Sequence, residues 1–363
     1  MPLPPSDDDL PFDARPEAAV LAAEAAPVPP DWVADHLQRH WGVAGELQPL
    51  SGERDVNHRL RLADGGQWLV KVSHPVEPPV VTDFQTQALL HLARQAPELP
   101  VQRLAPTRAG EPAATARAPD GRPRVLRLIS WLEGLPMPLA RMDADGRARQ
   151  RDSVAALLAR LDQALAGLSH PAAALALPWD ISRAQQVRSL LQALPDTGQR
   201  QCALAALAVF EADARSQLGQ LPRQPIHNDF NIHNLLVDPQ DPQRLCGVLD
   251  FGDMLAAPRV NDLAVAAAYQ LEPDGDALAT VAGFAAAYHR VAPLQPLELD
   301  LLWPLVQARL AMVVAISSWR AARQPQQAAY LMRNNAVSWA RLHACADITT
   351  RHAREALHAA CRL

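Results

Sequence analysis

The residues of this sequence that could do chemistry gather in the segment 226–253, which contains the strings IHNDFNIHNLLVD and GVLDFGD. An H-x-D-x4-N motif begins at His227, and a D-F-G motif follows at Asp250, a combination typical of phosphoryl-transfer sites. Such a site needs a carboxylate that accepts the proton of an attacking hydroxyl. We expect Asp229 to be that base and His227 to organise the loop around it. The site also needs oxygen ligands for Mg²⁺, a hard cation, and we expect Asn234 and Asp250 to supply them.

The flanks of the two motifs predict the element that carries the metal ligands. The apolar run 235–237 ends at an Asp-Pro turn signal, and a second apolar run, 246–249, leads directly into Asp250. Two such runs around a turn predict a β-hairpin, with Asn234 at the start of one strand and Asp250 at the end of the other. An ordinary surface loop is the alternative interpretation of H-x-D-x4-N by itself, because Asn, Asp and His are common in turns. The D-F-G at hairpin distance argues against it.

Lys71 is the only lysine in a chain that has 34 lysines and arginines in total. It lies near the end of a strand-like run, 67–72, where the phosphoryl-transfer template keeps a lysine. A compact ammonium on a flexible stem reaches between the α- and β-phosphates of a nucleotide, whereas a guanidinium is wide and flat. We therefore expect Lys71 to hold the phosphates. The alternative is a residual lysine on the surface.

These residues resemble those of the aminoglycoside phosphotransferase and choline kinase superfamily of small-molecule kinases. The strings HNDFNIHNLLVD and GVLDFGDM are most similar to hydroxylysine kinases and to the kinase-like domains fused to some class III aminotransferases. The superfamily usually has H-G-D, and Asn228 replaces the glycine here. The resemblance implies an α+β, bilobal, protein-kinase-like fold with a small antiparallel β lobe, one helix in that lobe, and a larger, mostly helical lobe. The nucleotide-binding lobe would be 31–132 and the catalytic and substrate-binding lobe 133–363.

The resemblance also places the nucleotide. A strand–loop–strand before Lys71 corresponds to the loop that covers the phosphates, although an ordinary hairpin turn would have the same pattern. The residues of this loop that we expect to contact the nucleotide are Gly52, Glu53, Arg54, Asp55 and Asn57. The strand-like run 124–132 would lead into a hinge whose backbone binds the purine. The hinge candidates are Ser130, Trp131 and Leu132.

The sequence departs from the template in one helix. Kinases place a glutamate there that pairs with the strand lysine, but the predicted helix 82–95 has no glutamate and offers Asp83 or Gln85 as substitutes. In relatives, acidic groups beyond the D-F-G receive the amine of the substrate. By that likeness Asp253 and Asp262 are candidate substrate contacts, although an acidic residue at position 262 also suits the first turn of a helix.

The resemblance implies Mg²⁺ as the cofactor and ATP or GTP as the phosphate donor, with GTP favoured in the hydroxylysine kinase branch. The first acceptor that it implies is a 5-hydroxylysine-type amino alcohol; homoserine, choline and aminoglycosides are alternatives. Two readings from other functional classes stay open. The missing glutamate and the H-N-D variant are compatible with a pseudokinase that binds nucleotide and regulates a partner. A detached amine-binding module is the other.

Composition bounds the remaining possibilities. The 363 residues are 49% hydrophobic and 20% charged, enough for a large core. A net charge of −5 gives no reason to expect nucleic acid or an anionic membrane as a partner. The four cysteines have no spacing typical of a zinc site or a disulfide framework. We find no signal peptide and no apolar run close to the ~20 residues that span a bilayer, so we expect a cytoplasmic protein. Oligomeric state stays open.

The rest of the chain is expected to be scaffold. Residues 1–30 are rich in Pro, Ala and Asp, which predicts a flexible arm. Apolar periodicity predicts helices over 32–41, 146–168, 200–221 and 258–270, and an almost entirely helical segment over 274–363. Trp303, Trp319 and Trp339 would pack in its core. A Trp-Asp pair at Trp179 resembles one in the hydroxylysine kinase-like group, and packing with helix capping explains it equally well.

Overall fold

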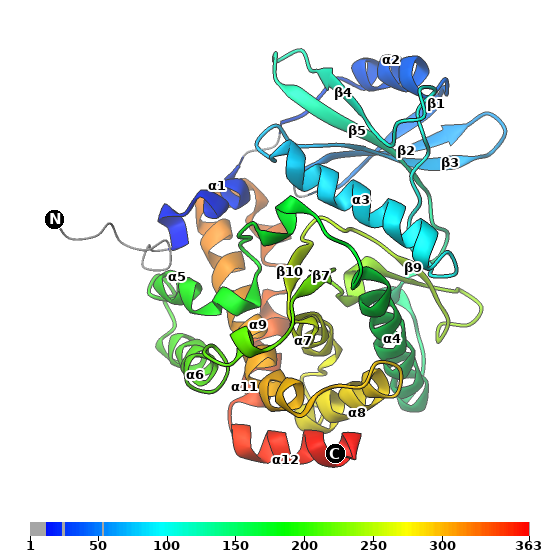
Figure 1. The fold of residues 1–363 in the computed structure, drawn as a ribbon. Helices are drawn as coiled ribbons and strands as arrows, with labels where there is room; N and C mark the ends of the chain where they lie inside the picture. Colours follow the sequence, from blue (N-terminus) through cyan, green and yellow to red (C-terminus); the bar gives the residue numbers. More distant parts are fainter. Residues whose placement is uncertain (1–11, 24–25, 53, 363) are drawn as a thin grey trace.

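A five-stranded antiparallel sheet forms most of the smaller lobe of this chain (Figure 1). The computed structural model describes residues 12–23, 26–52 and 54–362. The strand order is β1-β2-β3-β5-β4. The strands are β1 (Gly45–Leu50), β2 (Val56–Leu62), β3 (Gln67–Val72), β4 (Ala114–Arg117) and β5 (Pro123–Ser130). The two helices of this lobe are α2 (Pro30–His40) and α3 (Pro79–Gln95). The fold is therefore the bilobal α+β arrangement that the resemblance implied, with α2 as an additional helix on the sheet.

Alternation along the strands aims the functional side chains into the space between the lobes. Successive side chains of a strand point to opposite faces of the sheet. In β3, Val70 and Val72 are buried in a core that includes α2, whereas Leu69 and Lys71 line a cavity on the other face. The same alternation in β5 sends Arg127 to the cavity. Helix α3 contributes its apolar side chains to the core of the larger lobe, so it joins the two lobes.

The hairpin that we expected after the catalytic motif is confirmed. β8 (Leu235–Val237) pairs antiparallel with β9 (Leu245–Val248), and β6 (Leu135–Pro136) extends this small sheet. A second pair, β7 (Gln224–Ile226) with β10 (Leu255–Ala257), lies on either side of the motifs in the sequence. The H-x-D-x4-N segment therefore runs from the end of one short strand to the start of another, and both strands fix its backbone.

Helices form the rest of the larger lobe, as the periodicity predicted. They are α4 (Ala144–Leu165), α5 (Arg188–Leu191), α6 (Thr197–Asp213), α7 (Arg259–Gln270), α8 (Ala277–His289), α9 (Pro296–Arg323), α10 (Ala328–Leu331), α11 (Asn335–Cys345) and α12 (Thr350–Cys361). α6 ends eight residues before the predicted 221, and a turn over 214–217 and a short 3₁₀ helix, Leu218–Gln220, follow it. Trp303, Trp319 and Trp339 are buried, as expected.

Helix α9 is the central helix of this lobe (Figure 1). Contrary to the expectation from the sequence, its length and composition would suffice to cross a membrane, but 94% of its apolar window is buried inside the protein. An apolar helix that other helices surround is a core helix. The backbone of α9 is therefore held in place by the helices around it, and so are the positions of its side chains.

The expectation of a flexible arm over residues 1–30 is wrong for the part that begins at Phe12. A 3₁₀ turn, Phe12–Ala14, and helix α1 (Pro16–Ala22) pack on the larger lobe, with Phe12 edge-on to Trp319 at 5.5 Å between ring centroids. Pro16 occupies the first turn of α1, where proline removes no needed hydrogen bond. The proline content hid a short amphipathic helix. Residues 1–11 and 24–25 of the expected arm lie outside the described residues.

Candidate active site

A cavity of about 500 Å³ lies between the lobes. This volume is within the range of small-molecule sites. Its walls come from β2, β3, β5, the segment 131–134 and the β8–β9 hairpin, and they include apolar side chains such as Ile129, Leu236 and Leu249. Lys71 and Asp250 line it as well. The cavity therefore combines apolar walls suited to a planar base with charged groups suited to phosphates.

Of the three hinge candidates, two line the cavity and one does not. Trp131 and Leu132 line the cavity, and the guanidinium of Arg59 lies 4.4 Å from the Trp131 ring centroid. Ser130 does not line it. Its N–H donates to the Arg103 carbonyl at 2.7 Å, and its hydroxyl accepts from the Arg103 N–H at 2.9 Å. The N–H and hydroxyl of Ser130 are thus engaged within the protein at the end of β5, and Trp131 and Leu132 are the hinge candidates that face the cavity.

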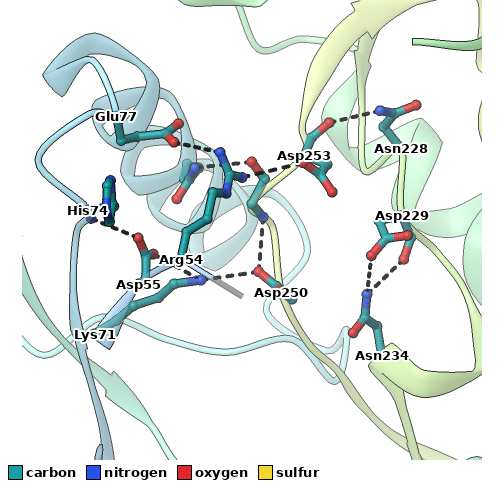
Figure 2. Close-up of polar contacts among 12 residues, drawn as sticks. Arg54, Asp55, Lys71, His74, Glu77, Asn228, Asp229, Asn234, Asp250 and Asp253 are labelled. Carbon is teal, nitrogen blue, oxygen red and sulfur yellow. Dashed lines mark hydrogen bonds and ion pairs between the residues drawn. The ribbon is translucent and has the colours of Figure 1, made fainter. Parts of the chain in front are cut away.

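Lys71 reaches across the cleft to Asp250 (Figure 2). Its Nζ lies 3.1 Å from Asp250 Oδ1 and 3.5 Å from Asp55 Oδ2. Burial by itself would lower the pKa of Lys71, but the two carboxylates outweigh burial and raise it. The same ammonium holds the pKa of Asp250 at about 2. Both groups are therefore charged at neutral pH, as a phosphate clamp and a metal ligand need to be.

Asp55, and not a residue of α3, is the second partner of Lys71. Asp83 instead contacts His170 at 3.0 Å, and the Gln85 side chain accepts from Arg127 at 2.9 Å. The two substitutes that the sequence suggested for the missing glutamate are therefore wrong. Asp55 precedes β2, the strand that pairs with β3, so its carboxylate approaches Lys71 through the sheet register.

The loop that carries Asp55 also crosses to the larger lobe. Arg54 lies 3.0 Å from Glu77 and 3.7 Å from Asp253 of the larger lobe. A Cβ on Gly52 would lie 2.6 Å from Asn57 Nδ2 and from the Asp55 carbonyl, so only glycine fits there. Glu53 lies outside the described residues.

Asn57, the last of the loop candidates, is the second residue of β2. It lines the cavity and stands opposite Lys71 in the register of β2 with β3. Its side-chain Oδ1 is buried with no hydrogen-bond partner among the described residues.

A buried carboxylate fixes the backbone of the catalytic loop. Asp262 Oδ2 accepts from the His227 N–H at 2.8 Å, and Asp262 Oδ1 accepts from the Asn228 N–H at 2.9 Å. Because both oxygens are used inside the protein and the residue is fully buried, Asp262 does not contact a substrate, and that prediction is wrong. Asn228 has a φ of 61°, a conformation that favours glycine and that asparagine tolerates best among other residues. This explains why asparagine can replace the glycine of H-G-D.

His227 ties this loop to the β8–β9 hairpin. Its Nδ1 accepts from the Asp229 N–H at 3.2 Å, so its Nε2 carries the hydrogen that it donates to the Leu249 carbonyl at 3.0 Å. Burial lowers the pKa of His227, which keeps this tautomer neutral. The geometry agrees with a loop-organising role.

Asp229 is held from three sides. Its Oδ1 accepts from Asn231 at 2.8 Å and from Arg309 at 3.2 Å, and its Oδ2 accepts from Asn234 at 2.7 Å. Burial raises the pKa of Asp229 to about 8, against the opposing charge of Arg309 and with a further rise from Asp253. A group whose pKa lies near neutral pH suits proton transfer.

The two expected metal ligands are brought together by the hairpin. The Leu249 N–H donates to the Asn234 carbonyl at 2.8 Å, which places Asn234 beside the residue that precedes Asp250. The Asn234 amide nitrogen faces Asp229, which leaves its amide oxygen for a cation (Figure 2). Within the described ranges, no three His, Cys, Asp or Glu side chains are grouped to hold a metal ion. Two oxygen ligands fit Mg²⁺, which keeps several waters and binds substrate phosphates.

The residue that sequence reasoning missed is Arg309. It comes from the middle of α9, and its side chain is 3% exposed. The ring of Trp179, which the Trp-Asp pattern singled out, lies 4.9 Å from its guanidinium carbon. Asp180 caps the following 3₁₀ segment through the Ser182 N–H. Nothing near position 309 in the sequence marks it, because its partner lies 80 residues away.

Comparison with known proteins agrees with this geometry. Residues 46–294 match the Phosphotransferase enzyme family. Hydroxylysine kinase of Danio rerio is 24% identical over 310 residues, which cover 83% of this chain and 86% of that protein. Hydroxylysine kinase of Mus musculus is 22% identical over 325 residues, with coverage of 84% and 85%.

Several solved structures share the fold, among them two that align with most of this chain. One is the amicoumacin kinase hAmiN in complex with AMP-PNP, Ca²⁺ and Ami, with a TM-score of 0.64, 12% identity, and coverage of 89% of this chain and 96% of that chain. The other is a microcompartment-associated aminopropanol kinase, with a TM-score of 0.62, 18% identity, and coverage of 86% and 99%.

Proposed function

Since the chain belongs to the phosphotransferase enzyme family, we propose that it transfers the γ-phosphate of ATP or GTP to the hydroxyl of a small hydroxylated amine, with 5-hydroxylysine as the first acceptor to test. A small-molecule kinase is the class that the family and the relatives support. The observation that carries the proposal is that the charged groups meet at the cleft: the Lys71–Asp250 pair faces the catalytic loop that holds Asp229 (Figure 2).

The reaction would form a bond between the acceptor oxygen and the γ-phosphorus. It would break the bond from that phosphorus to the bridging oxygen of the nucleoside diphosphate, and the acceptor proton would pass to Asp229. Lys71 would bind the phosphates that precede the transferred group. Asn234 and Asp250 would hold Mg²⁺, which neutralises phosphate charge when it is bound.

A second carboxylate near Asp229 and the similarity to hydroxylysine kinases support a cationic acceptor. Asp253 lies near the base, is only partly exposed, and raises the pKa of Asp229 through its own negative charge. An ammonium group close to these two carboxylates would relieve their repulsion. The similarity to hydroxylysine kinases favours 5-hydroxylysine among such acceptors. Homoserine, choline and aminoglycosides are the alternatives that the same assay compares.

No observation favours the regulatory or binding-only alternatives. The missing glutamate left Lys71 without an obvious partner, but Asp55 and Asp250 now fill that place. The H-N-D variant raised the same doubt, and Asn228 adopts the backbone conformation that a glycine would.

The test is phosphate transfer from ATP and from GTP, each with Mg²⁺, to 5-hydroxylysine, homoserine, choline, ethanolamine and kanamycin. Release of the nucleoside diphosphate and the mass of the product are both measured, because release without product is only hydrolysis. Product formation with one acceptor, lost in Asp229→Asn, is the expected result. Tight Mg²⁺-dependent nucleotide binding without any phosphorylated product across the panel would count against the proposed acceptor class.

A further inference from the structure

Arg309 is a buried cation that no part of the phosphoryl-transfer template requires. Its Nε and NH1 are buried and make no hydrogen bond of ordinary geometry among the described residues, and the guanidinium also interacts with the Tyr269 hydroxyl. Its NH2 donates to Asp229 Oδ1, and its planar group lies over Trp179. A buried guanidinium is costly to a fold unless it is paired, and the charged partner of Arg309 is the carboxylate of Asp229.

The donors around Asp229 leave one place open. An ionised carboxylate has about four acceptor sites, two on each oxygen. Asn231 and Arg309 fill both sites of Oδ1, whereas Asn234 fills one of the two on Oδ2. The Asp229 side chain is 22% exposed, so the remaining site can be reached.

We propose that Arg309 is a positioning residue for the phosphoryl transfer, which occupies Oδ1 of Asp229 and thereby makes Oδ2 the atom that takes the acceptor proton. This inference rests on the proposed function and assigns a role within that same site. Asn231 and Asn234 belong to the same loop as Asp229 and move with it. Arg309 donates from outside the loop, on a helix buried in the core of the larger lobe. Its hydrogen bond therefore holds the Asp229 carboxylate in a fixed position relative to that core.

The other cations of the cleft do not compete for this place. Lys71 contacts Asp250 and Asp55, and Arg54 contacts Glu77 and Asp253. Arg127 donates to Gln85, and Arg59 lies over the Trp131 ring. Trp179 fixes the guanidinium from one face, which limits the directions in which its N–H groups can point. A guanidinium has a fixed fork of donors, so its orientation determines that of its partner.

The experiment compares Arg309→Met, Arg309→Lys and Arg309→Ala with Arg320→Met. Arg320 is a buried arginine of the same helix, about 16 Å further along its axis, and serves as the matched control for loss of a buried cation. We expect Arg309→Met to lower kcat by about 10- to 100-fold. The KM and Kd for nucleotide should stay nearly unchanged, because Arg309 is not among the residues that line the cavity. Arg309→Lys should recover part of the loss, and methylguanidinium should raise the kcat of Arg309→Ala but not that of Asp229→Asn.

An unchanged kcat in Arg309→Met would overturn the inference. So would a loss of kcat that Arg320→Met reproduces at an equal fall in Tm, or an Arg309→Ala enzyme that methylguanidinium does not rescue. Crystal structures of the wild-type protein and Arg309→Lys give a readout that needs no acceptor and no drastic substitution. A wild-type Asp229 with Oδ1 free of Arg309 contradicts the inference whatever the substrate. If the contact between Arg309 and Asp229 Oδ1 is present but no acceptor of the panel is phosphorylated, only the proposed function is contradicted.

Discussion

Two ion pairs of similar length behave differently in this molecule. Lys71 and Asp250 approach to 3.1 Å, and Arg309 and Asp229 approach to 3.2 Å. The pKa of Asp250 is lowered to about 2, chiefly by Lys71, whereas burial raises the pKa of Asp229 to about 8 in spite of Arg309. The Asp250 side chain is 54% exposed and that of Asp229 is 22% exposed.

The difference teaches what each carboxylate is suited for. Lys71 stabilises the charge of Asp250, with a smaller contribution from the Gly252 N–H that donates to it, so Asp250 is ionised across the physiological range and suits a metal ligand. Asp229 loses most of its hydration and stands near two other carboxylates, so it holds a proton more readily and suits a base. The first pair joins the two lobes, and the second lies wholly within the larger lobe.

Among the changes to these two ion pairs, removal of the proposed base should have the largest effect on activity. Asp229→Asn keeps the shape of the side chain but cannot take a proton, so we expect kcat to fall by about 10³-fold with the nucleotide Kd nearly unchanged. Steady-state kinetics and calorimetric titration with nucleotide check the two halves of this prediction. Turnover close to that of the wild type would remove Asp229 from the role of base.

Lys71→Arg tests whether shape or charge matters in the pair that joins the lobes. Arginine retains the positive charge, but its planar group is wider than the ammonium that now lies between Asp250 and Asp55. We expect a fall in kcat/KM of about 10²-fold at saturating Mg²⁺, because phosphate positioning is lost. An arginine enzyme as active as the wild type would show that charge suffices and that the single lysine of the chain has no special role.

The backbone beneath Asp229 offers a smaller test. Asn228→Ala should lower the free energy of unfolding by about 1–2 kcal/mol, because alanine is strained at a φ of 61° and also loses the hydrogen bond to the Asp253 carbonyl. Asn228→Gly removes the strain and should lie between alanine and the wild type. Urea unfolding of the three proteins measures the order. Equal stability of the alanine and wild-type proteins would be incompatible with strain at this position.

The smallest effect is expected for the stability of the protein at Asp162, the buried neighbour of Asp262. Burial and the neighbouring Asp262 raise the pKa of Asp162, so the folded protein binds a proton that the unfolded chain releases near its ordinary pKa. A raised pKa of an acid contributes stability that is present at low pH and is lost as pH rises toward the folded value. Asp162→Asn imitates the protonated acid and can still accept from the Tyr288 hydroxyl.

We therefore expect the fall in unfolding free energy between pH 5 and pH 8 to be smaller in Asp162→Asn than in the wild type, by about 1 kcal/mol. Urea titrations at the two pH values check this difference. An equal or steeper fall in the variant would mean that Asp162 is not protonated in the folded protein at low pH.

Much of the site followed from short stretches of sequence. The H-x-D-x4-N motif, the hairpin and the D-F-G lie within one segment, and turn signals with apolar runs were enough to place Asn234 near Asp250. The strand-like run 67–72 identified Lys71 as the candidate phosphate ligand, and the structure places it on the cleft side of β3. The errors arose where a residue had an equally good local explanation. Asp262 carried an acidic group at a plausible place, but both of its oxygens bind backbone N–H groups.

The sequence by itself determined the chemistry that we propose for this protein, because a base, two metal ligands and a phosphate-binding lysine need particular residue types at particular local spacings. The tertiary structure decided which groups support them. Asp55 replaces the helix glutamate because of the sheet register, and Arg309 reaches Asp229 because α9 runs through the core. The segment beginning at Phe12 is ordered because Trp319 covers it. Contacts between distant parts of a chain leave no local pattern, since each depends on how whole elements pack.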